Sequence, residues 1–374
     1  MPGGTAREAG GGERESPRAP RRRSPGPRRR SRRPARPSPH PTRRGRWSRR
    51  ATRRPDRHDR EGADPSGGVC PPGRTAKYAR PVHAYRTPDE YFDELPGYPF
   101  AAHYVEQEGL RMHYLDEGSG PPVLLLHGEP TWSYLYRKVI PELTPSARAI
   151  APDYLGFGRS DKPLRVADYS YDRHTDSIRR LVEELDLHDL TVVVQDWGGP
   201  IGLRLAVEQP ERVARLVIMN TGIGAGRPPS EEWLRFRAFV RRHGTDLVPG
   251  RLVRISCVQP LDDAVEEAYS APWPVPESKA GVLAFPEHVP TEPEHPNTPP
   301  LLAVREALGR WEKPALVLFS DSDPIFSPRV AERLAAHIPG ALEPEIVSDA
   351  GHFLQEDRGE VVGARIAAFV ETER

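Results

Sequence analysis

An aspartate stands where this chain must turn sharply from a strand into a helix. Residues 192–194 are valines, a β-branched run typical of a strand buried in a sheet. Gln195, Asp196 and Trp197 follow directly, and two glycines then open a helical stretch. A buried strand, a tight turn and a glycine-rich helix start hold the side chain of the turn residue at the carboxyl edge of a sheet. The sequence therefore predicts an α/β fold with Asp196 in a site at that edge.

The residue type at this turn limits the chemistry. In the α/β-hydrolases, which share this arrangement, the usual serine attacks acyl carbons. A carboxylate in its place attacks a saturated carbon and makes an alkyl-enzyme ester, which points to dehalogenation or to epoxide opening. The alternative interpretation is an ordinary aspartate at a strand end that caps the following helix.

The net charge of +1 hides two different kinds of polypeptide. Residues 1–60 hold 21 arginines and 5 acidic residues, whereas the remaining 314 residues hold 33 basic and 48 acidic ones. The first 80 residues have almost no aliphatic side chains. Such a segment cannot bury enough apolar surface to offset the entropy of ordering, so we expect residues 1–80 to be disordered.

The basic segment has several possible origins. A nucleic-acid-binding arm would be arginine-rich, but the acidic remainder of the chain gives it no support, and we expect no nucleic-acid partner. A transit peptide should form an amphipathic helix, which the many prolines forbid, and the apolar stretch of a secretory signal is missing. A reading frame opened too early in GC-rich DNA is the interpretation we favour, with a genuine disordered tail as the alternative.

Strand-like segments alternate with helical spacing through the rest of the chain. We predict strands within residues 105–116, 123–126, 147–151, 191–194, 216–219 and 315–319, and helices at residues 171–185 and 202–207. Strands that alternate with helices form a parallel sheet covered on both faces. The predicted fold is therefore the α/β-hydrolase fold, with a mostly parallel, doubly wound sheet.

The alternation breaks between Asn220 and about Pro300. This stretch contains helix-like segments at residues 231–242 and 262–269, many prolines and no convincing buried strand. Such an insertion after a core strand covers the edge of the sheet where ligands bind. After the basic segment we therefore predict a first part of the core at residues 81–221, a helical cap at residues 222–300 and a second part of the core at residues 301–374.

Two further residues complete a catalytic set with Asp196. Asp323 follows the predicted strand at residues 315–319, and His352 lies in a glycine-containing loop near the carboxyl terminus. Nucleophile, acid and histidine is the chain order of α/β-hydrolases. Asp321 is the alternative acid, less favoured because Asp323 lies closer to the expected position. A histidine oriented by an acid can remove a proton from the water that attacks the ester.

The developing negative charge on the ester oxygen requires backbone N–H donors. The turn supplies the amide of Trp197, and the loop after the strand at residues 123–126 should supply the amide of Glu129. The indole N–H of Trp197 can also bind a departing halide in a dry pocket, although Trp197 could instead be a large core residue.

The remaining features exclude other classes of protein. Cys70 and Cys257 provide neither a disulfide framework nor metal-ligand spacing. No apolar run is long enough to cross a bilayer, and we expect a cytoplasmic monomer without a membrane partner. No metal or organic cofactor is implied, because water and a leaving group suffice for the chemistry.

The residues from about Val82 to the carboxyl terminus resemble the haloalkane dehalogenases, especially the subfamily with Glu after His-Gly. The matching stretches are residues 86–90, 109–114, 127–137 (HGEPTWSYLYR), 153–163 (DYLGFGRSDKP), 195–199 (QDWGG), 268–274 (AYSAPWP), 320–325 and 350–357 (AGHFLQED). The set is highly specific, although parts of it occur across the wider superfamily.

The resemblance implies a hydrolase that converts haloalkanes and water into alcohols and halide. It also implies that Asp196 is the nucleophile, His352 the base, Asp323 its partner and Trp197 one of two halide-binding tryptophans. Members of the family begin near the position of Val82, where the codon could be GUG. We therefore expect a native start there.

The second halide-binding tryptophan is where the sequence departs from the family. The family has a cap stretch resembling FLAWRRF, whereas residues 233–239 read WLRFRAF. Phe236 occupies the tryptophan position and offers no N–H. We hypothesise that Trp233, three residues earlier on the same helical face, supplies the donor instead. The alternative is a weakened halide site or a different leaving group.

Three other functions remain to be weighed. Epoxide hydrolases share Asp-Trp-Gly-Gly but generally need two cap tyrosines, and residues 222–300 contain only Tyr269. They also carry an aromatic residue where this chain has Glu129. Fluoroacetate dehalogenases have Arg where this chain has Trp197. A non-catalytic binding protein of this fold would usually lack the nucleophile or the histidine. The preferred haloalkane depends on cavity shape, which the sequence does not give.

Overall fold

The computed structural model of this chain describes residues 82–224 and 228–372. The basic segment at residues 1–80 lies outside them, so the predictions about its disorder and about the native start stay predictions. In the part of the chain that the structure describes, no helix is both long enough and apolar enough to cross a membrane.

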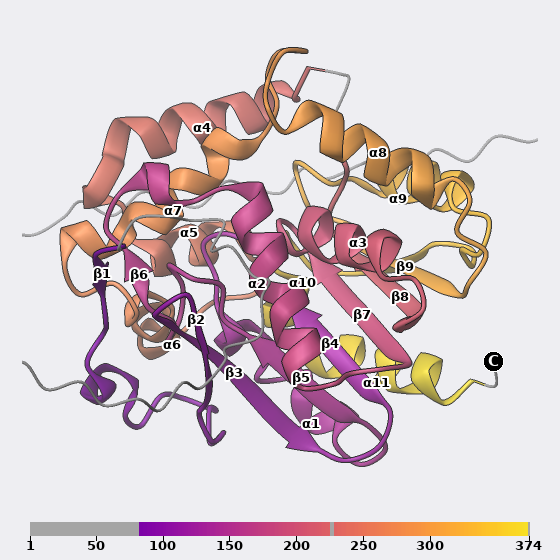
Figure 1. Ribbon diagram of the computed structural model, residues 1–374, viewed down its shortest axis with the longest axis horizontal. Helices are drawn as coiled ribbons and strands as arrows, with labels where there is room; N and C mark the ends of the chain where they lie inside the picture. Colours follow the sequence, from indigo (N-terminus) through magenta and orange to yellow (C-terminus); the bar gives the residue numbers. More distant parts are fainter. Residues whose placement is uncertain (1–81, 225–227, 373–374) are drawn as a thin grey trace, which may run out of the picture. The chain divides into compact units, whose positions relative to one another are not determined.

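Eight strands form one sheet in the order β10-β9-β8-β7-β4-β5-β3-β2 (Figure 1). All neighbours from β5 to β10 pair in parallel, and β3 and β2 extend the sheet antiparallel. The strands are β2 (His103–Gln107), β3 (Leu110–Gly118), β4 (Pro122–Leu126), β5 (Arg148–Pro152), β7 (Leu190–Gln195), β8 (Val213–Met219), β9 (Ala315–Ser320) and β10 (Glu345–Val347). The predicted mostly parallel sheet is confirmed.

Two short pairings refine the predicted strands. The strand-like run at residues 105–116 divides into β2 and β3 at a turn where Glu108 and Gly109 both have positive φ. A separate two-stranded sheet pairs β1 (Ala84–Tyr85) with β6 (Lys162–Pro163), which ties the start of the described chain to the loop after β5.

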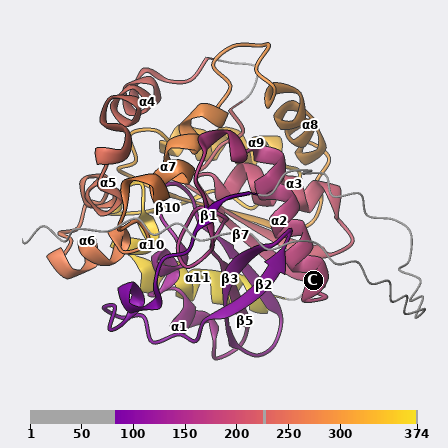
Figure 2. The same cartoon turned by 60° about the vertical axis from the view of Figure 1, so that its left-hand side comes forward.

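The strands β4, β7, β8 and β9 are buried almost throughout, because helices cover both faces of the sheet. One layer contains α2, α3 and α8, and α1 packs against α11 in the other (Figures 1 and 2). The helices are α1 (Ile140–Leu143), α2 (Tyr171–Glu184), α3 (Gly198–Glu208), α8 (Thr298–Leu308), α9 (Pro328–His337), α10 (Leu354–Asp357) and α11 (Gly359–Glu371).

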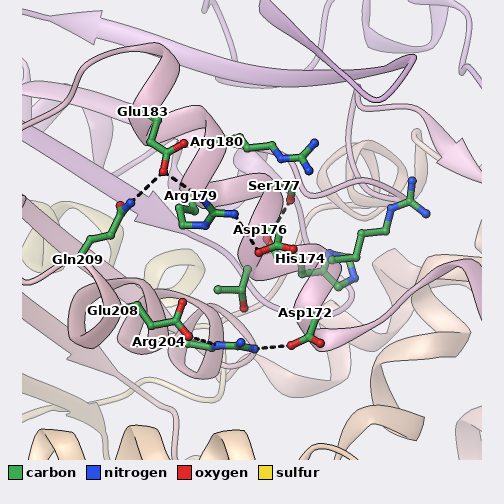
Figure 3. Close-up of polar contacts among 12 residues, drawn as sticks. Asp172, His174, Asp176, Ser177, Arg179, Arg180, Glu183, Arg204, Glu208 and Gln209 are labelled. Carbon is green, nitrogen blue, oxygen red and sulfur yellow. Dashed lines mark hydrogen bonds and ion pairs between the residues drawn. The ribbon is translucent and has the colours of Figure 1, made fainter. Parts of the chain in front are cut away.

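Polar side chains join α2 to α3 at the surface (Figure 3). Arg204 of α3 forms ion pairs with Asp172 of α2 and with Glu208 on its own helix, each at 2.7 Å. Gln209 donates a hydrogen bond of 3.0 Å to Glu183 of α2. These exposed pairs contribute little free energy each, and the apolar faces of the two helices dominate their packing.

Between β8 and α8 the described residues form helices and contain no strand. The helices are α4 (Glu231–His243), α5 (Pro249–Ser256), α6 (Asp263–Ser270) and α7 (Ala280–Ala284), with short 3₁₀ turns between them. The helix-like segments expected at residues 231–242 and 262–269 correspond to α4 and α6. The exact division into core and cap stays a prediction.

A buried ion pair holds α6 against the rest of the molecule. Arg137 forms two hydrogen bonds of 2.5 and 2.8 Å with Glu356 of α10, and both side chains are buried. Tyr269 of α6 donates a hydrogen bond of 2.6 Å to the same carboxylate. Removing one member would leave a buried polar group unpaired, so this trio fixes how α6 docks on α10.

Candidate active site

Asp196 occupies the strained turn that the sequence predicts. It follows the last residue of β7 and precedes α3, and its φ of 49° lies in the left-handed region that residues with a Cβ rarely adopt. The Asp196 N–H donates to the carbonyl of Asn220, and its carbonyl accepts a hydrogen bond from Thr221 Oγ1 at 2.6 Å. These contacts to the end of β8 stabilise the turn and aim the carboxylate at the carboxyl edge of the sheet.

Two glycines allow the close approach that this turn requires. A Cβ at Gly198 would collide with the Leu126 carbonyl of β4, and one at Gly128 would collide with the Asp196 carboxylate. The loop after β4 and the start of α3 can therefore reach the same carboxylate only without side chains at these positions.

The structure brings the three residues of the expected catalytic set together. His352 Nδ1 lies 2.7 Å from Asp323 Oδ2, and His352 Nε2 lies 3.6 Å from Asp196 Oδ2. Because the Asp323 carboxylate accepts at Nδ1, the proton of neutral His352 resides there and leaves the Nε2 lone pair facing Asp196. Asp321 instead accepts hydrogen bonds from the backbone of Asp349 and Ala350, and does not contact His352.

The two backbone amides expected to stabilise the ester oxygen both donate hydrogen bonds to the Asp196 carboxylate. The Glu129 N–H donates to Asp196 Oδ1 at 2.8 Å, and the Trp197 N–H is also hydrogen-bonded to this carboxylate. Oδ1 therefore lies at the Glu129 amide while Oδ2 faces His352. The two carboxylate oxygens have different surroundings, as a nucleophile with one fixed and one reactive oxygen needs.

Charges and burial act against each other in this site. Burial raises the pKa of Asp196, although His352 and the two backbone amides partly oppose it. Burial by itself lowers the pKa of His352, but the charge and hydrogen bond of Asp323, with the charge of Asp196, outweigh it and raise that pKa above its ordinary value. Burial would likewise raise the pKa of Asp323, and His352 reverses the direction and lowers it.

Several residues around the histidine escaped sequence reasoning. Gln195 Nε2 lies 3.2 Å from His352 Nε2, and Asn220 Nδ2 donates to the His352 carbonyl at 3.2 Å. Phe326 stacks on the imidazole with ring centroids 5.9 Å apart. Gln195 and Asn220 are polar residues at the ends of apolar strands, which is the signal that could have revealed them.

The Glu129 side chain was also not anticipated, since only its amide was assigned. The side chain is buried, and Oε1 has no hydrogen-bond partner among the described residues. Burial raises the pKa of Glu129 well above its ordinary value, and the nearby charge of Asp196 raises it further. Burial and the Asp196 charge therefore both favour the neutral form of the Glu129 carboxyl, which can donate a hydrogen bond when it is protonated.

A cavity of about 800 Å³ opens over the catalytic set. Asp196, His352 and Asp323 lie in its wall with Glu129 and Trp197, and α4 and α5 contribute further residues. Trp197 packs against Phe285 at 5.0 Å between ring centroids, and its indole N–H has no hydrogen-bond partner among the described residues. His288 packs edge-on against Trp197 at 6.1 Å, and burial lowers the pKa of His288 to about 4.

Comparison with known proteins places this geometry in a family. Residues 121–359 match the family described as the alpha/beta hydrolase fold. The chain is 48% identical over 300 residues to a haloalkane dehalogenase of Mycolicibacterium paratuberculosis, which covers 77% of this chain and 98% of that protein. The chain belongs to the haloalkane dehalogenase family. It is also 48% identical over 295 residues to haloalkane dehalogenase 1 of Mycobacterium tuberculosis, covering 76% and 97% respectively.

Solved haloalkane dehalogenases have the same fold. The tetrameric haloalkane dehalogenase DpaA from Paraglaciecola agarilytica NO2 aligns with a TM-score of 0.74 at 36% identity, covering 78% of this chain and 100% of that one. Haloalkane dehalogenase DbeA from Bradyrhizobium elkani USDA94 aligns with a TM-score of 0.63 at 28% identity, covering 72% and 97%. The predicted fold and family are confirmed, whereas the expectation of a monomer stays a prediction.

Phe236, which stands where the resemblance leads us to expect a halide-binding tryptophan, lies in the cavity wall. Phe236 and Trp233 both line the cavity from one face of α4, and both are half-buried. The Arg237 guanidinium lies 5.1 Å above the Trp233 ring. Trp273, in the AYSAPWP stretch, donates its N–H to the Gly156 carbonyl at 3.0 Å and is not in the wall. Among the described residues, Trp197 and Trp233 are the tryptophans that face this cavity.

The electrostatic role of Asp323 gives a prediction that needs no substrate. Replacing Asp323 with Asn removes the charge that opposes burial, so the pKa of His352 should fall. An NMR titration of the His352 ring protons measures this directly. Asp321→Asn is the matched control, because Asp321 does not contact His352, and it should leave the pKa unchanged. An equal pKa in both variants would contradict this account of the site.

Proposed function

We propose that this chain hydrolyses the carbon–halogen bond of haloalkanes through an ester on Asp196, with His352 as the base and Asp323 as its partner. The observation that carries the proposal concerns the two oxygens of the Asp196 carboxylate, of which one accepts a hydrogen bond from the Glu129 amide and the other faces His352. A serine at this turn would serve acyl transfer, whereas a carboxylate in an apolar cavity suits displacement at a saturated carbon.

In the first step Asp196 Oδ2 attacks the carbon that bears the halogen. The carbon–oxygen bond forms as the carbon–halogen bond breaks, and the halogen leaves with the bonding pair as halide. Burial assists this step, because few water molecules solvate the attacking carboxylate. The amides of Glu129 and Trp197 keep Oδ1 in place while Oδ2 reacts.

In the second step water attacks the carboxyl carbon of the ester. His352 Nε2 takes a proton from that water, and Asp323 stabilises the imidazolium that forms. The negative charge that develops on Oδ1 is met by the amides of Glu129 and Trp197. Collapse of the tetrahedral intermediate releases the alcohol and restores the Asp196 carboxylate. Since only neutral His352 accepts the proton, this step should accelerate as pH rises through the raised pKa of His352.

The leaving halide needs donors in the cavity. Trp197 offers an indole N–H, and we propose Trp233 as the second donor in place of the tryptophan missing at position 236. Trp233 is the remaining cavity-lining tryptophan among the described residues, on the helix where the family has its own donor. We also assign this chain to the branch of the family with Glu after His-Gly, because Glu129 stands at that position.

Epoxide hydrolysis is the second candidate, and the position of Tyr269 weighs against it. A cap tyrosine that protonates an epoxide oxygen must reach the cavity. Tyr269 is fully buried, donates its hydroxyl proton to Glu356 and is not among the cavity-lining residues. The described part of residues 222–300 offers no other tyrosine. A non-catalytic binding protein of this fold would usually lack the nucleophile or the histidine. In this chain Asp196, Asp323 and His352 are all present and lie together.

Trapping the ester tests the proposed function. With His352→Gln the first step remains possible and the second loses its base, so a bromoalkane should leave one alkyl group on the protein. Mass spectrometry of residues 82–374 and of the peptide that contains Asp196 measures this adduct. The wild type should release bromide catalytically. Asp196→Ala should neither form the adduct nor release bromide. Bromide release by Asp196→Ala at the wild-type rate would refute the nucleophile.

The halide site can be tested through product inhibition. Losing a charge-assisted hydrogen bond costs about 1.5–3 kcal/mol, so Trp233→Phe should weaken bromide inhibition roughly 10- to 150-fold. Phe236→Trp should strengthen inhibition, and Phe239→Trp, on the exposed side of the same helix, is its control. If Trp233→Phe leaves bromide inhibition and turnover untouched, Trp233 is not a donor.

A further inference from the structure

The cavity extends well beyond the catalytic residues, to helices α8 and α9. Its volume of about 800 Å³ is in the range of sites that hold drug-sized ligands, far more than a small haloalkane fills. Helices α8 and α9 lie beside each other in both views, and His337 Nε2 of α9 lies 2.7 Å from the Arg305 carbonyl of α8 (Figures 1 and 2). The part of the wall that these helices form takes no part in the chemistry described above.

Each of the two helices presents one face to the cavity. On α8 the lining residues are Leu301, Arg305 and Leu308, at spacings of four and three residues. On α9 they are Val330, Arg333, Leu334 and His337, again at the spacing of a single helical face. Each face therefore combines aliphatic side chains with one arginine.

Polarity is distributed unevenly along the cavity. The carboxyl groups in its described wall are those of Glu129, Asp196 and Asp323, all at the catalytic end. The arginines in the wall are Arg305 on α8 and Arg333 on α9, and both are solvent-exposed. Aliphatic and aromatic side chains also line the cavity, from Phe326 stacked on His352 to Leu301, Leu308 and Leu334 on the same helices as the two arginines.

Of the two arginines, Arg333 is the better placed to bind a ligand. Among the described residues it forms neither an ion pair nor a hydrogen bond, so its guanidinium is available to a ligand. A guanidinium binds carboxylates through two parallel N–H donors, which gives orientation as well as attraction. Catalytic residues in one part of the wall, exposed arginines on α8 and α9 and an otherwise largely apolar lining match the polarity of a chain with a halogen at one end and an anion at the other.

We propose that the cavity selects haloalkanes that carry a carboxylate at the end opposite the halogen, with Arg333 as the residue that determines this specificity. The proposal rests on the proposed function and names the substrate class of that same site. The halogenated carbon lies at Asp196, the methylene chain packs along the apolar wall, and the carboxylate lies at the outer rim against Arg333 and Arg305. Arg333 contributes to binding, and it does not contact the reacting atoms.

Paired substrates test this specificity. An ω-bromoalkanoate and the neutral bromoalkane of the same chain length are compared in the wild type, in Arg333→Glu and in Arg329→Glu. Arg329 lies on the same helix, is exposed and is not in the cavity wall, so it controls for the change in net charge. We expect Arg333→Glu to raise KM for the bromoalkanoate about tenfold without changing kcat, since the interaction is made equally in the ground and transition states.

The neutral bromoalkane should have the same KM in all three proteins. Added salt should weaken the preference for the bromoalkanoate, because the arginine is exposed and screened. Equal KM values for the bromoalkanoate in Arg333→Glu and Arg329→Glu would overturn the proposed substrate class while leaving dehalogenation intact.

Calorimetric binding of the alkanoate without its halogen separates this proposal from the proposed function. It needs no turnover, so it remains informative even if no bromide is released from any substrate. The affinity should fall about tenfold in Arg333→Glu and stay unchanged in Arg329→Glu. If the wild type releases no bromide but the variants bind the alkanoate as expected, the proposed chemistry is refuted and the carboxylate site is retained. If Arg333→Glu and Arg329→Glu bind the alkanoate equally, the carboxylate site is refuted.

Discussion

The left-handed backbone at Asp196 is the constraint on which the rest of the site depends. It turns the chain from β7 into α3 within two residues, so that the carboxylate projects from the edge of the sheet instead of lying along it. The loop after β4 can then place the Glu129 amide 2.8 Å from Oδ1, because Gly128 leaves room for the carboxylate. A different backbone at this one residue would separate the Asp196 carboxylate from its amide donors and from His352.

Burial favours the neutral forms of the side chains in this site, and neighbouring charges oppose that effect. Each member of the catalytic set would favour its neutral form if it were alone in the apolar site. Asp323 overcomes that tendency at His352, and His352 in turn overcomes it at Asp323. The Glu129 side chain has no hydrogen-bond partner at Oε1 among the described residues, and burial with the Asp196 charge raises its pKa. Two buried acids close to each other, Asp196 and Glu129, thus differ in their surroundings, because the imidazole of His352 opposes the effect of burial at Asp196 and not at Glu129.

The sequence predicted the parts of the molecule that local patterns determine. The valine run and the glycines predicted the sheet and the turn. The chain order of Asp196, Asp323 and His352 predicted that these side chains lie together, since all three follow parallel strands. It did not predict Gln195, Asn220 and Phe326 around His352, because these contacts join strands far apart in the chain. The burial of Glu129 and the extension of the cavity to Arg333 were also out of reach, because both depend on how helices pack over the sheet.

The covalent ester between Asp196 and the substrate distinguishes the proposed mechanism from direct attack by water. A single turnover in water enriched in the heavy oxygen isotope, with enzyme in excess over a bromoalkane, tests it most directly. The ester route predicts an alcohol that carries the ordinary isotope, because its oxygen comes from Asp196, and a heavy oxygen in the Asp196 carboxylate found by peptide mass spectrometry. A labelled alcohol with an unlabelled Asp196 would show direct attack by water and contradict the account.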